Sequence, residues 1–262
     1  GMKILLTGAA GFISSHLSER LLSQGHEVVG LDSFDDFYDP RIKEENLEEA
    51  RAPRGCHLVR GDIRDPEVLA NLPQGIEAII HIAARAGVRP SIAEPVLYYD
   101  VNVNGTLQLL ELARERGIRR FIFASSSSVY GNNRKVPFSE GDRVDHPISP
   151  YAATKKAGEL LCHTYHHLYG ITVLCLRFFT VYGPRQRPDL AIRKFARLLS
   201  RGEEIPMFGD GSSQRDYTYI QDILGGVLGG LAWTMENQDA YEIVNLGESR
   251  TVSLEEMIRV VG

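Results

Sequence analysis

Short apolar runs alternate with amphipathic stretches along most of this chain. The stretches at 12–24, 96–116 and 151–169 have the apolar spacing of helices. The apolar runs are expected strands at 3–7, 27–32, 57–62, 78–83, 120–125, 172–179 and 242–246. Strands that are apolar throughout and separated by helices are typical of a parallel sheet covered on both faces. The sequence therefore predicts an α/β fold with a doubly wound, Rossmann-type parallel sheet.

The expected strands end in small and polar residues. These ends are Thr7-Gly8, Asp32, Asp62, Ala83-Ala84, Ser125–Ser128 and Phe179-Thr180. Doubly wound sheets bind their ligands at the carboxyl ends of the strands. We therefore expect the functional site along this edge of the sheet.

The pattern becomes less regular after residue 180, where prolines and the glycine-rich segment 209–213 interrupt it. We expect residues 1–180 to form a cofactor-binding domain that also carries the catalytic residues. Residues 181–262 are then a smaller substrate-binding lobe, and the run at 242–246 returns to the sheet as a late strand. The chain stops inside a helical pattern at 253–261, so we expect it to be truncated at its C-terminus.

Composition argues against several classes of partner. The net charge of −5 provides no general basic field for nucleic acid, and no apolar run approaches the ~18–20 residues that span a membrane. The three cysteines lack the spacing of metal ligands, which favours reduced thiols and a cytoplasmic location. His163, His166 and His167 have a spacing that could hold a metal, but no acid accompanies them, so we expect no metal site.

The segment TGAAGFISSH, residues 7–16, has the outline of a turn that wraps the phosphates of a nucleotide. Gly8 and Gly11 permit a tight turn and a close approach of the backbone to a diphosphate. The helix that follows begins near Phe12 and Ile13, and its N-terminus supplies N–H donors and partial positive charge. We expect these four residues to bind a dinucleotide.

Two acids at later strand ends support the cofactor assignment. Asp32 ends the second expected strand, where a carboxylate can bind both ribose hydroxyls of adenosine. No arginine follows it directly, and its charge would repel a 2′-phosphate, so NAD is favoured over NADP. Asp62, in the segment GDIRD, is expected at the adenine edge.

Ser14 occupies a position in this turn where glycine is usual. A glycine there lets the first helix pack closely on the sheet. The serine hydroxyl can bond back to a carbonyl one turn earlier. We expect a slight outward shift of that helix rather than loss of the cofactor site.

Tyr151 and Lys155 lie at i and i+4 in SPYAATKKAG, the start of an expected helix. A tyrosine has a reference pKa near ~10, so it is a weak base unless a cation favours the phenolate. A lysine one turn away can supply that cation. The segment SSSSVYG, residues 125–131, lies at another strand end and offers hydroxyls that can hold a substrate oxygen.

At this point the chain resembles the extended short-chain dehydrogenase/reductases, in the group of sugar-nucleotide epimerases and dehydratases. The matching segments are TGAAGF, Asp32, GDIRD, HIAA, SSSSVYG, YAATK, LRFFTVYGP and RDYTYIQD, in family order over residues 3–222. The resemblance implies that Tyr151 is the acid/base, that Lys155 tunes it and binds the nicotinamide ribose, and that Ser126 bonds the reacting sugar oxygen. It also places Ile63, Ala83 and Ala84 at the cofactor.

The two residues after Ser126 argue against a dehydratase reaction. Related 4,6-dehydratases carry Asp-Glu where this chain has Ser127 and Ser128, and a serine cannot deliver a proton to a poor leaving group. The segment FTVYGPRQRPD, with Thr180, resembles that of the UDP-glucuronate 4-epimerases. The three hydroxyls could hold the sugar carboxylate out of alignment with a C4 ketone, so that CO₂ is not lost. The expected reaction is NAD-dependent epimerisation of UDP-glucuronate to UDP-galacturonate.

The sequence is also compatible with other functions. The chain could be a UDP-glucose 4-epimerase, another sugar-nucleotide epimerase or reductase, or a non-catalytic NAD-binding scaffold. Arg185 and Arg215 are expected to bind the diphosphate of the UDP-sugar, because guanidinium groups pair well with diphosphates. The resemblance places Arg89 beside the sugar, and a salt bridge within its loop is the equal alternative. The resemblance further implies a homodimer that pairs through the helices at about 96–116 and 151–169.

Overall fold

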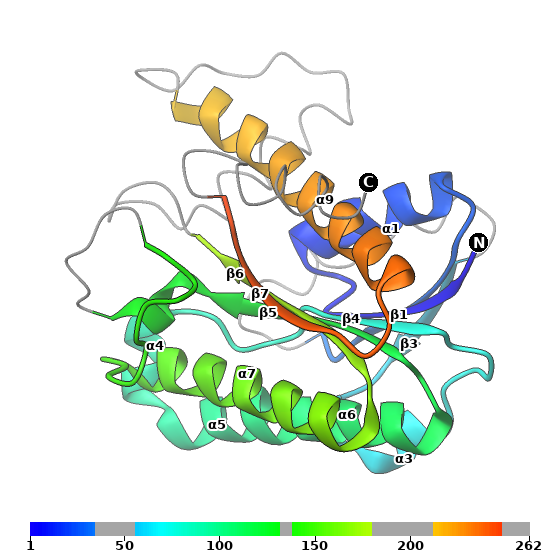
Figure 1. Ribbon diagram of the computed structural model, residues 1–262, viewed down its shortest axis with the longest axis horizontal. Coiled ribbons are helices and arrows are strands. Elements are labelled where there is room, and N and C mark those ends of the chain that lie inside the picture. The colour runs from blue at the N-terminus through cyan, green and yellow to red at the C-terminus, as the bar shows by residue number, and fades with distance from the viewer. Residues whose placement is uncertain (35–55, 132–137, 180–211, 248–262) are drawn as a thin grey trace.

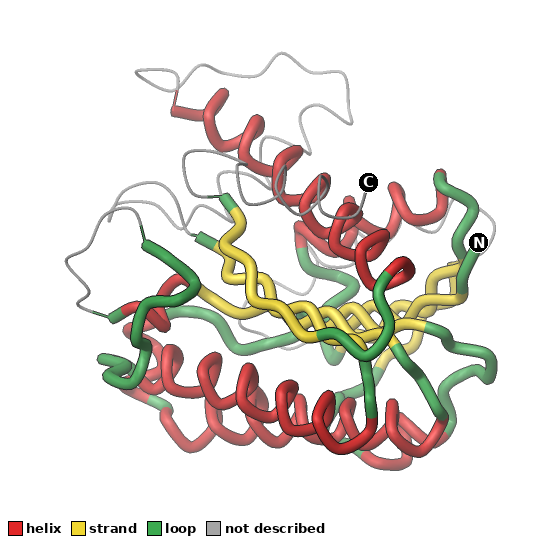
Figure 2. Tube along the Cα trace, in the orientation of Figure 1, coloured by secondary structure: helices red, strands yellow, loops and turns green. Residues whose placement is uncertain are grey.

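The computed structural model describes residues 1–34, 56–131, 138–179 and 212–247, without the side chains of 212–219. Within these residues, seven parallel strands form one sheet in the order β3-β2-β1-β4-β5-β6-β7. The strands are β1 (Lys3–Thr7), β2 (Glu27–Asp32), β3 (Cys56–Arg60), β4 (Ala78–His81), β5 (Arg120–Ser126), β6 (Thr172–Phe178) and β7 (Tyr241–Leu246). The predicted doubly wound parallel sheet is confirmed (Figure 2).

Helices cover both faces of the sheet (Figure 1). On one face lie α1 (Phe12–Ser23) and α9 (Ser212–Glu236). The other face carries α3 (Pro66–Ala70), α5 (Pro95–Tyr99), α6 (Gly105–Arg116) and α7 (Pro150–Tyr169). The described residues also contain three short elements, namely α4 (Val88–Ala93), the π-helical turn η1 (Asp100–Asn104) and the 3₁₀ turn η2 (Ser127–Tyr130).

Alternate strand residues enter different cores, as the period of a strand requires. Ile4 and Leu6 of β1 pack in the core shared with α1 and α9, whereas Leu5 packs in the core shared with α6 and α7. All three side chains are fully buried. The near-continuous apolar strands of the sequence therefore reflect burial on both faces.

The long helix α9 was not predicted from the sequence. Its glycines weaken a helical pattern, but at Gly230 a Cβ atom would lie 2.6 Å from Cδ2 of Leu174 on β6. The absence of a side chain there lets α9 approach the sheet closely. Side chains between Ile220 and Leu246 contribute to the core shared with α1 and β1.

Two strands end two residues earlier than expected. β3 ends at Arg60 and β4 at His81, whereas the apolar runs continue to Asp62 and Ala83. The following residues form loops at the carboxyl edge of the sheet, which is where the functional site is expected. No helix in the described part of the chain is long and apolar enough to cross a membrane.

Candidate functional site

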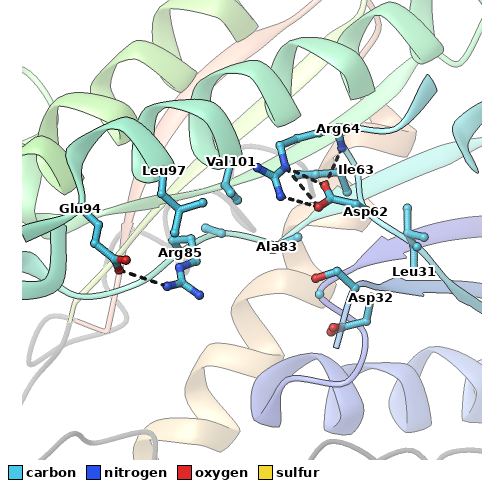
Figure 3. A pocket seen from close by; sticks show the side chains of 14 residues that line it. Leu31, Asp32, Asp62, Ile63, Arg64, Ala83, Arg85, Glu94, Leu97 and Val101 are labelled. Carbon is cyan, nitrogen blue, oxygen red and sulfur yellow. Dashed lines mark hydrogen bonds and ion pairs between the residues drawn. The ribbon is translucent and has the colours of Figure 1, made fainter. Parts of the chain in front are cut away.

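A groove with a volume of about 490 Å³ runs along the carboxyl ends of β1, β2, β3 and β4 (Figure 3). Six residues predicted to bind the cofactor line it, namely Gly8, Asp32, Asp62, Ile63, Ala83 and Ala84. β1 and β4 are adjacent in the sheet although β2 and β3 lie between them in sequence. The groove therefore lies at the topological switch point, where such sheets bind ligands.

Gly8 needs to be glycine because of its backbone. Its φ angle is +66°, and a Cβ atom there would lie 3.0 Å from both Cα and the backbone nitrogen of Ala83. Any side chain would therefore strain the turn and press on the loop after β4. The turn brings the backbone directly to the floor of the groove.

The turn leads directly into α1, and N–H groups in the first turn of this helix have no acceptor within the helix. The Gly11 N–H donates to the Gly8 carbonyl at 2.9 Å, and Gly11 occupies the N-cap position of the helix. The N–H groups of Phe12 and Ile13 lie in the first turn, where a helix has no internal acceptors for them. This arrangement can receive an anionic group.

Asp32 is buried at the end of β2 and fixes the turn. One carboxylate oxygen accepts the Ala10 N–H at 3.0 Å and the other accepts the Phe34 N–H at 2.7 Å. Each oxygen can accept a further hydrogen bond. Asp32 can thus hold the phosphate-binding turn and a ribose hydroxyl at the same time.

Asp62 forms an ion pair with Arg64 across the groove lining. The Arg64 guanidinium donates to both carboxylate oxygens, at 2.6 Å at the closest, and also to Asp100 at 2.7 Å. The hydrogen bonds from Arg64 lower the pKa of Asp62, although burial opposes them. Asp62 therefore remains an ionised acceptor at neutral pH.

The hydroxyl of Ser14 does not make the bond to a carbonyl one turn earlier that a serine can make in a helix. Ser14 is buried, and its Oγ has no hydrogen-bond partner among the residues that the structure describes. The neighbouring Ser15 makes the local bond, from its Oγ to the Phe12 carbonyl at 2.9 Å. Ser14 therefore leaves a buried polar atom unsatisfied, which destabilises the fold.

Replacing Ser14 by Ala should raise the free energy of unfolding by about 1 kcal/mol, because the unsatisfied hydroxyl is removed. Urea denaturation measures the change. Ser15→Ala is the matched control, and it should lower the stability because a satisfied hydrogen bond is lost. NAD affinity should stay equal or become tighter with Ser14→Gly. A destabilised Ser14→Ala protein would contradict this explanation.

A buried hydrogen-bonded chain joins the end of β1 to the end of β4 and to η1. Thr106 donates to the Asn102 carbonyl at 2.6 Å, so its oxygen accepts from Nε2 of His81 at 2.9 Å. Nδ1 of His81 then accepts from Thr7 at 2.7 Å. The Thr7 oxygen also accepts the N–H of Ala83 at 3.1 Å. Burial lowers the pKa of His81 to about 3, with a smaller effect from the Lys155 charge, so His81 stays neutral and this polarity is fixed.

Helix α7 places Tyr151 and Lys155 one turn apart. Ser149 caps the helix by accepting the Ala152 N–H at 3.1 Å, and the Tyr151 N–H donates to Ser91. The Lys155 ammonium lies 5.9 Å from the centre of the Tyr151 ring and donates to the Ala124 carbonyl at 2.8 Å. Burial lowers the pKa of Lys155 to about 8, although the Glu159 carboxylate opposes this shift. A cation is therefore held beside the phenol.

The serines after β5 form a compact polar turn beside α7. Ser126 is buried, and its Oγ accepts the Ser128 N–H at 3.1 Å and the Ser128 hydroxyl at 2.9 Å. Ser127 and Ser128 are half-buried. This turn offers hydroxyls but no carboxylic acid, which suits hydrogen bonding to a substrate and not the elimination of water.

A buried ion pair lies beneath this turn, and the sequence analysis did not identify it. Glu159 receives two hydrogen bonds at 2.9 Å from Arg177 on β6 and one at 2.6 Å from Ser125. Arg177 also donates to the Tyr130 hydroxyl at 3.0 Å, and Tyr130 donates to Asn245 on β7. Burial alone would lower the pKa of Arg177, but the bonds and charge of Glu159 raise it. The network links α7 to three strands, β5, β6 and β7.

The predicted substrate-binding residues are only partly described. Arg89 is exposed on α4, which packs against α7. Thr180 and Arg185 lie outside the described residues, as does the side chain of Arg215. Their roles stay predictions.

The groove also contains charged residues that the sequence analysis missed. Arg64, Arg85 and Glu94 line it, together with Leu97 and Val101. Arg85 directly follows Ala83 and Ala84, which were expected at the cofactor, so its position in the sequence could have indicated that it lines the groove. Glu94 comes to the groove through the short helices α4 and α5, whose packing no local pattern indicates.

The groove suits a dinucleotide. A glycine turn that excludes any side chain, a helix N-terminus and a buried acid at the next strand end are the features that such a cofactor needs. Tyr151 and Lys155 lie on α7, and Ser126 ends β5, the strand next to β4 in the sheet. Together they can support reversible transfer of a hydride and a proton at an alcohol carbon.

Known proteins share this arrangement. Residues 4–247 match the NAD dependent epimerase/dehydratase family. The UDP-glucuronate 4-epimerase of Thermodesulfobacterium geofontis is 42% identical over 260 residues, which are 98% of this chain and 79% of the relative. Among solved structures, the UDP-glucuronic acid 4-epimerase from Bacillus cereus in complex with UDP-glucuronic acid and NAD has a TM-score of 0.75. It is 36% identical, and the match covers 95% of this chain and 78% of that one.

A dehydratase also matches, at lower identity. DesIV, a dTDP-glucose 4,6-dehydratase from Streptomyces venezuelae, was solved with NAD and TYD bound. It is 31% identical with a TM-score of 0.72, over 99% of this chain and 80% of that one. The fold is thus shared across different reactions, and the site residues must distinguish between them.

Proposed function

The chain belongs to the NAD dependent epimerase/dehydratase family, and from that membership we propose that it epimerises UDP-glucuronate at C4 to give UDP-galacturonate. NAD is the cofactor, as in the related solved structures. The observation that carries most weight is the pairing of Tyr151 and Lys155 on α7 beside a turn of serines that lacks a carboxylic acid.

Tyr151 acts as the acid and base of the reaction. Its phenolate removes the proton of the C4 hydroxyl, and Lys155 lowers the cost of forming that phenolate because it holds a positive charge nearby. Bound NAD supplies the hydride chemistry, since it can accept a hydride from C4 and return it. After the 4-keto sugar turns over in the site, Tyr151 gives the proton back to the oxygen at C4.

The serine turn supports the choice of epimerisation. Ser126 bonds the reacting oxygen, while Ser127, Ser128 and Thr180 are proposed to hold the sugar carboxylate. A C4 ketone makes this sugar a β-keto acid, which loses CO₂ when the carboxylate bond aligns with the ketone. Hydroxyls that hold the carboxylate out of alignment also compensate its charge. Arg89, Arg185 and Arg215 are proposed to bind the diphosphate and the sugar.

Turnover of competing UDP-sugars tests the proposal. With NAD present, UDP-glucuronate should give UDP-galacturonate signals by NMR without net NADH, at a higher kcat/KM than UDP-glucose. Faster turnover of UDP-glucose would contradict the preference for an acid sugar and would favour a UDP-glucose 4-epimerase. Accumulation of NADH would indicate a dehydrogenase, and NAD binding without turnover of any sugar would indicate a scaffold.

We also propose that the protein is a homodimer that pairs through the layer of α5, α6 and α7. The outer side of this layer exposes large apolar side chains, with exposed fractions of 58% for Leu160, 60% for Leu168 and 81% for Val96. Burial of such residues between two copies would stabilise association.

We also propose, from the sequence, a cytoplasmic location and a substrate-binding lobe within 181–262.

Leu160→Glu should convert the dimer to a monomer, because a charge would then face the partner's apolar surface. Light scattering after size-exclusion chromatography measures the mass over a range of concentrations. Met235→Glu is the control, since Met235 is 47% exposed on α9, on the other face of the sheet. A Leu160→Glu protein that keeps the wild-type mass would contradict this interface.

A further inference from the structure

The two arginines that line the groove, Arg64 and Arg85, differ in the ion pairs that they form (Figure 3). Arg64 is matched by two carboxylates, Asp62 and Asp100, at 2.6 and 2.7 Å. Arg85 pairs with Glu94 at 3.6 Å, and its side chain is 11% exposed whereas that of Glu94 is 56% exposed. This ion pair therefore joins a largely buried guanidinium to a mostly exposed carboxylate.

The backbone of Arg85 is fixed independently of this ion pair. Its N–H donates to the Asn102 side chain at 2.8 Å, and its carbonyl accepts from the same side chain at 3.1 Å. The guanidinium lies 5.9 Å from the centre of the Tyr98 ring, whose hydroxyl bonds the Ala86 carbonyl. The side chain can thus change partners while its attachment to the fold stays in place.

The chemistry of the groove indicates which partner a ligand would provide. Gly8 and Arg85 line the same groove, and the acids Asp32 and Asp62 line it as well. A dinucleotide with its adenosine at the acids must carry its diphosphate past Gly8, and that diphosphate bears two negative charges. A guanidinium forms short, charge-assisted bonds with phosphate oxygens, which are stronger than a 3.6 Å contact to an exposed carboxylate.

We propose that Arg85 is a cofactor-binding residue that exchanges the Glu94 carboxylate for the diphosphate of the dinucleotide. Glu94 then competes with the cofactor for one guanidinium. The two members of the ion pair have opposite effects on cofactor affinity, which a pair with a purely structural role would not have. This inference rests on the proposed use of NAD.

Calorimetric titration of NAD into protein freed of bound dinucleotide tests the inference. Arg85→Gln should weaken NAD binding about tenfold, because a charge-assisted bond is lost, and Arg85→Lys should have an intermediate effect. Glu94→Gln should tighten binding a few-fold, since the competing carboxylate is gone. The double variant should match Arg85→Gln alone. Adenosine, which has no phosphate, should bind all variants equally.

Arg114→Gln and Glu111→Gln provide the matched control, because they break an exposed ion pair on α6 and should leave NAD affinity unchanged. The inference is overturned if both groove variants shift NAD affinity in the same direction, if neither shifts it, or if adenosine binding falls in parallel. It is also overturned if Arg85→Gln raises only the KM of the UDP-sugar. A wild-type protein that binds no NAD would overturn the proposed function as well.

Discussion

Replacing Tyr151 by Phe should lower kcat for epimerisation about 10²–10⁴-fold while NAD affinity stays unchanged. The substitution removes the hydroxyl that takes and returns the proton, and it keeps the ring that packs near Lys155. The measurement is the rate of UDP-galacturonate formation, together with NAD binding by calorimetry. Loss of kcat without loss of cofactor affinity separates a chemical role from a structural one.

Tyr165→Phe is the matched control for this variant. Tyr165 lies near the far end of the same helix, and burial together with the nearby Glu111 raises its pKa to about 12. Its hydroxyl is therefore no candidate base, and its removal should leave kcat near the wild-type value. The catalytic role of Tyr151 would be contradicted if the two variants had similar rates.

The second large effect concerns the buried ion pair between Glu159 and Arg177. Glu159→Ala should lower the free energy of unfolding by about 3–5 kcal/mol, because Arg177 would remain buried without its partner. Ser125 would also lose an acceptor. Urea denaturation measures the loss, and Glu159→Leu combined with Arg177→Met should recover part of it. An unchanged stability in Glu159→Ala would contradict the role of this pair.

Glu159 also has a predictable effect on the pH dependence of the reaction. Its carboxylate raises the pKa of Lys155, which burial lowers to about 8. Without that carboxylate the pKa of Lys155 falls further, so Lys155 loses its charge at a lower pH. The fall in activity on the alkaline side should therefore move to lower pH in Glu159→Gln. A shift to higher pH would contradict this coupling.

Local patterns predicted much of the fold. The bounds of β1 and β2 agree with the apolar runs, because strands buried on both faces carry an uninterrupted apolar signal. Helix α9 escaped prediction because its glycines look unfavourable in isolation. At Gly230 a glycine is needed because Leu174, which is distant in the sequence, packs where a Cβ atom would lie.

Some site residues also have a local sequence signature, whereas others are placed by long-range packing. Gly8 and Asp32 were predicted to bind the cofactor, and both line the groove, because the turn and the strand end leave a local signature. The partners of Glu159 and of Arg85 depend on long-range packing, so no spacing indicates them. The hydroxyl of Ser14 could have bonded locally, and the structure instead leaves it without a partner among the described residues.

The fate of the hydrogen at C4 tests whether the protein epimerises the sugar through a 4-keto intermediate. When UDP-glucuronate labelled with deuterium at C4 is incubated with the protein and NAD, the product UDP-galacturonate should retain the label at C4. Retention is expected because the same hydrogen leaves as a hydride and returns to the same carbon. Loss of the label to solvent, or the absence of a C4-inverted product, would contradict epimerisation through a 4-keto intermediate.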